Sequence, residues 1–171
     1  RAVHGAFNDL WNPVTRNAVA EVREQVADEL SSCEAVLIAG GNVSALLDQL
    51  TLLDLRHLLA HIRVVAWSAG AMAITDKIVL FHDSPPQGQS DPELYDDGLG
   101  LAPGVVALPH ASARLRLDDE QRVAIFAGRF APAECVTLDE GCGIQWDGER
   151  WSQGSLPSAA RSVSKPVAAQ D

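Results

Sequence analysis

Apolar positions near the start of the chain follow a helical period. Residues spaced four apart are hydrophobic from position 14 to position 30, which predicts an amphipathic helix over residues 12–30. Asn12 is a favoured helix cap and Pro13 suits the first helical turn. The stripe that we expect to face the core consists of Val14, Ala18, Val22, Val26 and Leu30.

The next part of the chain alternates short apolar runs with helical segments. The run EAVLIAGG is apolar and ends in two glycines, which is typical of a buried parallel strand. The strands predicted in this way cover residues 34–41, 63–67, 77–81, 105–110, 133–139 and 142–151, the last turning at Asp147-Gly148. The helices predicted between them cover residues 44–62 with a break near Thr51, residues 68–75, and residues 118–130 from an Asp118–Gln121 capping box.

This order predicts an α/β fold, a mostly parallel sheet with helices on both faces. Residues 1–151 form one domain in this prediction. The segment 82–104 is a long loop rich in Pro, Gly and Asp, and residues 152–171 have little to bury and form a flexible tail. Ligands in such folds bind beyond the carboxyl ends of the strands, where AGGN and WSAG both fall.

Composition narrows the classes of partner. The 171 residues carry a formal net charge of −10, which argues against nucleic acid as the main partner. No apolar segment reaches the roughly 18 residues of a membrane helix, and no signal peptide opens the chain. The three cysteines, Cys33, Cys135 and Cys142, show no CxxC spacing, which suits a reducing cytoplasm.

Cofactors and metals are not expected. His57 and His61 stand four apart and would share one face of a helix. No Glu or Cys joins them at the spacing of a metal site, so a solvated helix face is the better interpretation.

Ser68 is the candidate nucleophile. A nucleophile elbow needs small residues two places either side of the serine, and here these places hold Ala66 and Gly70. The N–H of Ala69 would point at the developing oxyanion. A serine that only caps the following helix would give the same pattern.

The glycines after the preceding strand add to this hypothesis. Gly40 and Gly41 allow the backbone to approach a ligand closely, so either could give the second oxyanion N–H. An ordinary tight turn is the alternative.

A nucleophilic serine needs a base and a carboxylate. His110 closes a strand and falls at the same sheet edge as Ser68, with His82 as its rival. Asp83, at the start of the long loop, is our choice of carboxylate. The alternatives are Asp76, Asp91, Glu93, Asp96 and Asp97.

Five segments together resemble peptidase family S51, the dipeptidase E and cyanophycinase group. They are LIAGGNVSALL, VVAWSAGAMAI, HDSPP, GLGLAPGVVALPHASARLR and LDEGCGIQWDG. The motifs of the dipeptidase E branch resemble, in chain order, Gly-Gly-Asn-Thr, Gly-Trp-Ser-Ala-Gly-Ala-Asn, Asn-Asp-Met-Pro and Asn-Pro-His. At the matching places this chain has Asn42, Ser68, Asp83 and His110. GLGLAPGVV and the arginines after the histidine are more similar to the cyanophycinase branch.

The resemblance implies a three-layer sandwich like that of class I glutamine amidotransferases, and a serine peptidase that uses no cofactor. It implies small peptide substrates with an aspartyl residue on the acyl side, α- or β-linked, and Asn42 near the substrate. Arg114 or Arg116 would pair with the aspartyl carboxylate, although both arginines could equally be surface charges.

The chain departs from the family pattern at three points. Ala66 replaces a glycine, Met72 stands where dipeptidase E has asparagine, and we expect the chain to lack the strand–helix unit with which the family normally begins. It would then be a fragment, a reduced relative, or a chain completed by a partner, and a homodimer stays open. The rival function is a catalytically silent module that binds a partner or small ligand. A glutamine amidotransferase is disfavoured because no cysteine lies on the elbow.

Overall fold

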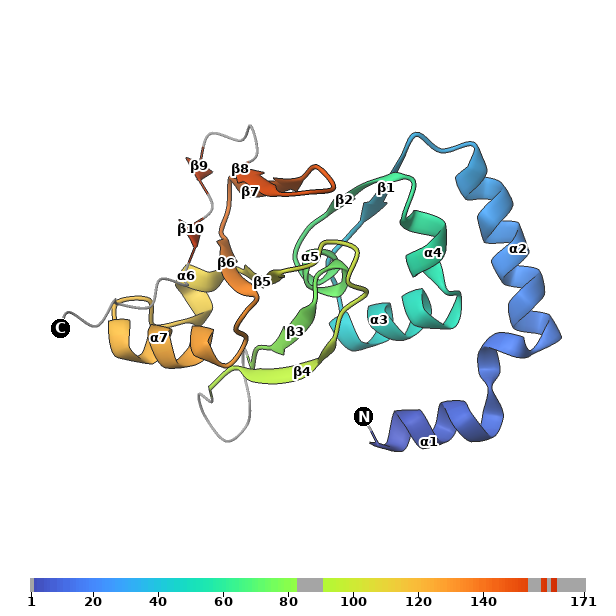
Figure 1. The fold of residues 1–171 in the computed structure, drawn as a ribbon, viewed down its shortest axis with the longest axis horizontal. Helices are drawn as coiled ribbons and strands as arrows, with labels where there is room; N and C mark the ends of the chain where they lie inside the picture. Colours follow the sequence, from blue (N-terminus) through green and yellow to red (C-terminus); the bar gives the residue numbers. More distant parts are fainter. Residues whose placement is uncertain (1, 83–90, 154–157, 160, 163–171) are drawn as a thin grey trace. The chain divides into compact units, whose positions relative to one another are not determined.

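The computed structural model describes residues 2–82, 91–153, 158–159 and 161–162 (Figure 1). The chain divides into two compact units, residues 1–70 and 71–171, and each is described by itself. Both are built from helices and short sheets, so the predicted α/β class is confirmed in this general form.

The first unit centres on a parallel pair of strands. β1 (Ala35–Ile38) runs beside β2 (Arg63–Ala66), with Ile38 opposite Ala66, as the two apolar runs predicted. The connection between them contains α3 (Val43–Leu52) and α4 (Leu55–Leu59), so the predicted helix break near Thr51 is confirmed (Figure 1). The buried side chains of the first unit are Ile38, Leu47, Leu50, Leu59 and Ala69.

The prediction for the N-terminal helix is wrong in the residue at which the helix begins and in the face that it buries. Asn12 has φ 37° and makes no side-chain cap, so α1 (Ala2–Trp11) is followed by a 3₁₀ turn, η1 (Pro13–Thr15). α2 (Asn17–Ser31) begins only after this turn. The half-buried face of α2 consists of Val19, Ala20, Arg23, Val26, Ala27 and Leu30, whereas Ala18 and Val22 are exposed.

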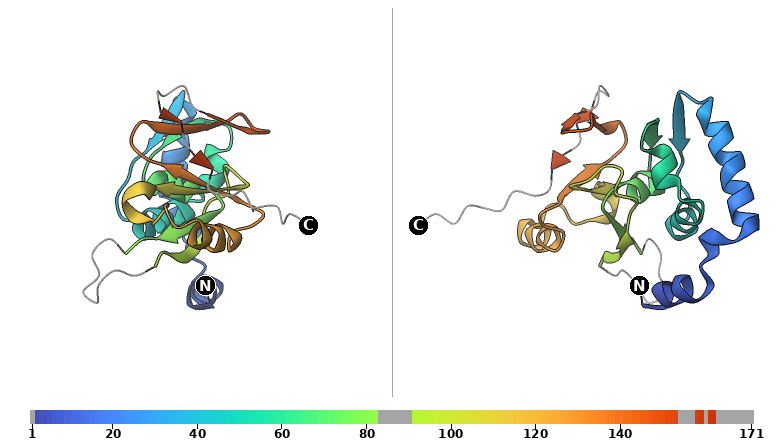
Figure 2. Two further views of the ribbon diagram at one scale, coloured as in Figure 1. Left: turned by 90° about the vertical axis from the view of Figure 1, so that its left-hand side faces the viewer. Right: turned by 45° about the vertical axis from the view of Figure 1, so that its right-hand side comes forward.

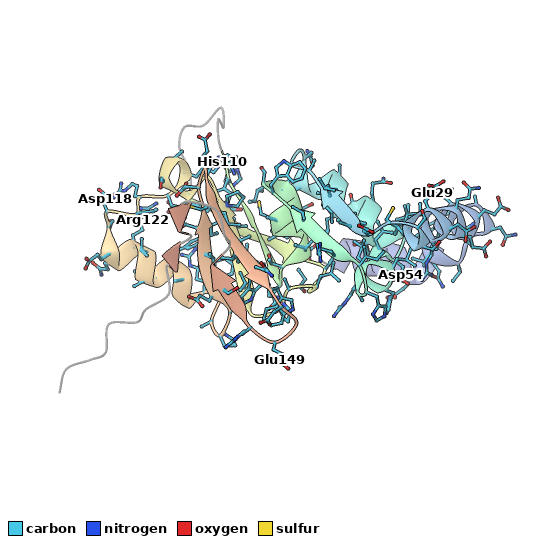
Figure 3. All side chains as sticks on the ribbon, turned by 90° about the horizontal axis from the view of Figure 1, so that it is seen from above. Glu29, Asp54, His110, Asp118, Arg122 and Glu149 are labelled. Carbon is cyan, nitrogen blue, oxygen red and sulfur yellow. The ribbon has the colours of Figure 1, made fainter. Side chains whose placement is uncertain are left out.

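The shift of this face has a polar cause. Arg23 pairs with Asp54 at 2.5 Å, which ties α2 to the residue before α4 (Figure 3 labels Asp54). Because the Arg23 guanidinium binds Asp54, the apolar part of the arginine side chain lies on the inner face of α2. A period counted from hydrophobic residues alone does not include such an arginine.

The second unit begins within α5 (Ala69–Ile74), which spans the boundary between the units. Its further helices are α6 (Ala111–Arg114) and α7 (Glu120–Gly128). Its strands are β3 (Lys77–Leu80), β4 (Glu93–Asp97), β5 (Val105–Pro109), β6 (Glu134–Leu138), β7 (Cys142–Trp146), β8 (Trp151–Gln153), β9 (Ser158–Ala159) and β10 (Arg161–Ser162).

The core of this unit lies between β5, β6 and α7. β5 and β6 are parallel, with Val105 opposite Glu134 and Pro109 opposite Leu138. α7 packs against one face of this pair (Figure 2). The buried side chains that meet there are Val79, Val106, Leu108, Ala111, Ala127, Phe130, Ala133 and Cys135.

Two details of this unit differ from the sequence prediction. The predicted loop 82–104 contains β4, which pairs antiparallel with β3. The acidic sequence of β4, ELYDD, did not indicate a strand. α7 is capped by Asp119 rather than by Asp118, since the Asp119 carboxylate accepts a hydrogen bond from the Arg122 N–H.

Other predicted strands are present. β7 and β8 form an antiparallel hairpin around Asp147-Gly148, as predicted. Two short strands lie within residues 152–171, where the sequence predicted a tail without strands: β9 pairs in parallel with β7, and β10 pairs antiparallel with β6. No helix in the described part of the chain combines the length and the apolar character that crossing a membrane requires.

Candidate functional site

Ser68 occupies a sharp turn between β2 and α5. Its backbone has φ 53°, in the left-handed region that residues with a Cβ adopt at a cost of about 1–3 kcal/mol. The preceding Trp67 N–H donates to Ile38 O at 3.2 Å, and the Gly70 N–H closes the turn on Trp67 O at 3.0 Å. This is the backbone geometry of a nucleophile elbow.

Gly40 lies directly against this serine. A Cβ at position 40 would lie 2.9 Å from Ser68 Cβ and 3.1 Å from Ser68 Oγ, so only glycine fits there without a shift. A Cβ at Gly70 would collide with Ile38 O. The first unit therefore brings together Gly40, Ser68 and Ala69, three residues that the sequence predicted to act together.

Two further predicted residues flank this turn. Gly41 has φ 140°, which favours glycine. Asn42 is the N-cap of α3, where its Oδ1 accepts a hydrogen bond from the Ala45 N–H at 3.0 Å. This contact explains an asparagine here structurally, and its role toward a substrate stays a prediction.

His110 follows β5 directly and is exposed (Figure 3). Its backbone is also left-handed, with φ 54° and ψ 38°. Its N–H donates to Leu138 O at 3.1 Å, and its carbonyl accepts from the N–H groups of Ala113 and Arg114 at the end of α6. The strand end thus presents the imidazole on a tight, hydrogen-bonded turn.

Asp139 is a residue of this region that the sequence reasoning missed. It follows β6 as His110 follows β5, and its two carboxylate oxygens accept hydrogen bonds from the Ser112 N–H at 3.0 Å and the Ser112 hydroxyl at 2.7 Å. The signal in the sequence is that His110 and Asp139 are the last residues of two successive predicted strands, 105–110 and 133–139.

The candidate carboxylates have different standings. Asp83 lies outside the residues that the structure describes. All five alternatives have polar contacts: Asp76 with Gly104 N–H at 2.6 Å, Glu93 with His82 Nε2 at 3.9 Å, Asp91 with Arg122, Asp96 with Asp97 N–H at 2.8 Å, and Asp97 with Lys77. Their contacts explain these carboxylates without a catalytic role.

The two candidate arginines lie in different surroundings. The Arg114 guanidinium sits 4.9 Å from the centre of the Phe81 ring and donates to Pro109 O at 3.4 Å. Arg116 is 68% exposed and pairs with Asp119 at 3.4 Å. Arg116 lines a hollow of about 280 Å³ beside α7. The side chains of Arg122 and Arg129 also line this hollow (Figure 3 labels Arg122).

The hollow beside α7 has an apolar floor. Leu115, Leu117 and Phe126 line it and pack against the buried core of the second unit. Asp91 and Asp119 also line it, so three guanidinium groups face two carboxylates. The lining therefore carries one more positive than negative side chain.

Metal and thiol chemistry have little support within the described residues. No three side chains of His, Cys, Asp or Glu gather there in a way that could hold a metal ion. Burial raises the pKa of the Cys135 thiol to about 12, which keeps it protonated. Cys135 is therefore a core side chain and not a nucleophile.

The family model described as Peptidase family S51 matches residues 10–154. No curated protein matches the chain. The matched range contains both Ser68, in the first unit, and His110, in the second.

Proposed function

The chain belongs to peptidase family S51, and from this premise we propose that it is a serine peptidase that cleaves aspartyl di- or short peptides, α- or β-linked, through an acyl-enzyme on Ser68. The observation that carries the proposal is the left-handed turn at Ser68, with Gly40 close against its Oγ. A serine that only caps a helix has an ordinary extended backbone and needs no glycine pressed against its hydroxyl.

The proposed mechanism assigns a role to each residue. His110 takes the proton of the Ser68 hydroxyl as the oxygen attacks the peptide carbonyl, and then gives that proton to the leaving amine. Asp83 orients the imidazole. The N–H groups of Ala69 and of Gly40 or Gly41 stabilise the oxyanion, and water, activated by His110, releases the acyl group. The three-layer sandwich of the family is part of this proposal.

Substrate selection is assigned to Arg116. Its exposed guanidinium, beside two further arginines and an apolar floor, can pair with an aspartyl carboxylate. Arg114 stays a second candidate, although its stacking on Phe81 and its contact with Pro109 O already give it a structural role.

The first test compares wild type with Ser68→Ala and with Ser31→Ala, which removes an exposed hydroxyl at the end of α2. Release of amino acids from a panel of α- and β-aspartyl peptides is measured. Ser68→Ala should lower kcat by roughly 10³-fold or more, because a nucleophile is lost, while Ser31→Ala should match wild type. Equal turnover in Ser68→Ala would refute the mechanism, and a folded wild type that cleaves nothing would favour the silent binding module.

The second test measures specificity with Arg116→Met. Loss of a charge-assisted pair should raise KM for aspartyl peptides by roughly 10-fold or more and leave the matched asparaginyl peptides unchanged. Arg56→Met, at an exposed arginine of α4, is the control. A rise in KM that is the same for both peptide series would contradict a carboxylate clamp.

A further inference from the structure

We propose that Asp139 is a positioning residue for His110: it clamps the turn that follows the histidine and so fixes where the imidazole can reach. The inference rests on the proposed function, because it takes His110 as the base. It assigns a role to a carboxylate that has no place in the mechanism above.

The register of the second unit places these residues side by side. The parallel pairing of β5 with β6 ends at Pro109 opposite Leu138, and the His110 N–H donates to Leu138 O at 3.1 Å, one step beyond it. Asp139 is the next residue of the neighbouring strand end. Adjacent strands lie about 4.8 Å apart, so its side chain reaches the backbone just after His110.

The clamp consists of two hydrogen bonds to one residue. Ser112 donates its N–H to Asp139 Oδ1 at 3.0 Å and its hydroxyl to Oδ2 at 2.7 Å. Hydrogen bonds to a charged acceptor are about twice as strong as neutral ones. Both carboxylate oxygens are thus engaged by the turn, which makes Asp139 a support of His110 rather than a group that reacts.

His110 needs such a support. Its left-handed backbone costs free energy, its side chain is exposed, and α6 is only four residues long, so the contacts of Asp139 add to the hold that the buried Ala111 gives the turn. A general base must lie within hydrogen-bond reach of the proton it takes, and a displacement of about 1 Å can cost 10²-fold in rate.

The test uses variants of the full chain that separate hydrogen bonding from charge. Asp139→Ala removes both acceptors, Ser112→Ala removes one bond, and Asp139→Asn keeps an oxygen for the Ser112 N–H and an amide that can donate to the Ser112 hydroxyl. Asp118→Ala, an exposed carboxylate of the same unit, is the control (Figure 3).

Positioning predicts a fall in kcat with KM nearly unchanged. We expect kcat to drop by roughly 10- to 100-fold in Asp139→Ala, less in Ser112→Ala, and to recover to within a few-fold of wild type in Asp139→Asn. Wild-type kcat in Asp139→Ala would overturn the proposal. So would an Asp139→Asn variant as slow as Asp139→Ala while both stay folded, as judged by thermal unfolding.

A second readout does not depend on catalysis. The ring signals of His110, assigned in NMR spectra with His110→Gln, should be a single sharp set in wild type and broadened in Asp139→Ala but not in Asp118→Ala. If wild type cleaves no peptide yet the broadening occurs, the proposed function fails and the clamp stands. If peptides are cleaved and neither kcat nor the ring signals change, the clamp fails alone.

Discussion

At the scale of single residues, Cys135 shows how burial sets chemistry. It is the second residue of β6, with 0% of its surface exposed, among the apolar side chains of β5 and α7. Its thiol pKa rises to about 12 mainly because the buried thiolate would lose its hydration, and the charge of Glu134 adds to the effect. The folded chain therefore binds this proton more tightly than the unfolded chain.

This difference predicts a loss of stability in alkali. Above pH 9.0, the ordinary value of the thiol pKa, the unfolded chain releases the proton while the folded chain keeps it until about pH 12. The free energy of unfolding should fall over this window by up to about 1.4 kcal/mol per pH unit from this group. Urea unfolding from pH 8 to 11 checks this. Other groups titrate there too, so the slope of wild type should be steeper than that of Cys135→Ala, and equal slopes would contradict the prediction.

At the scale of elements, close backbone packing holds β4 in place. Gly98 follows β4, and its N–H donates to Asp76 O at 2.9 Å. A Cβ built at this glycine would collide with Thr75 O, which is backbone and cannot swing away. This position tolerates no side chain unless the segment shifts.

Gly98→Ala should therefore destabilise the chain by about 1–3 kcal/mol, the usual cost of overpacking. Gly128→Ala is the matched control, because a Cβ at the end of α7 meets nothing within 4 Å. That change should be neutral or stabilising by up to about 1 kcal/mol. Midpoints of urea unfolding compare the two, and equal midpoints would show that the chain yields around Gly98.

Elements that consist of a short apolar run were predictable from the sequence, whereas β4 and the start of α2 were not. β1, β2 and β5 follow from short hydrophobic runs that end in Gly or a polar residue. β4 carries the sequence ELYDD and exists through its pairing with β3, which composition does not encode. The predicted start of α2 was wrong because the left-handed backbone at Asn12 turns the chain before this helix begins.

At the scale of the whole molecule, the candidate site also contains features that the sequence predicts and features that it does not. The Ser68 turn was predictable, since small residues at fixed offsets are a local property of the chain, and Gly40 was expected near it because the two predicted strands end at the same edge of a sheet. Asp139 was not, because its contact with Ser112, 27 residues away in sequence, depends on the register between β5 and β6. Family membership, predicted from five separated segments, is confirmed over residues 10–154.

The left-handed backbone at Ser68 and His110 has a consequence for how this sequence can vary. Among the residues that the structure describes, four other than glycine have positive φ, and two of them, Asn12 and Asp54, are of types that tolerate it well. Selection for stability alone would favour glycine at positions 68 and 110, where the backbone would relax. Under the proposed mechanism, a relative that has lost its activity is free to drift toward glycine at these two positions, so the residues found there in another member of the family would record whether catalysis is still being maintained.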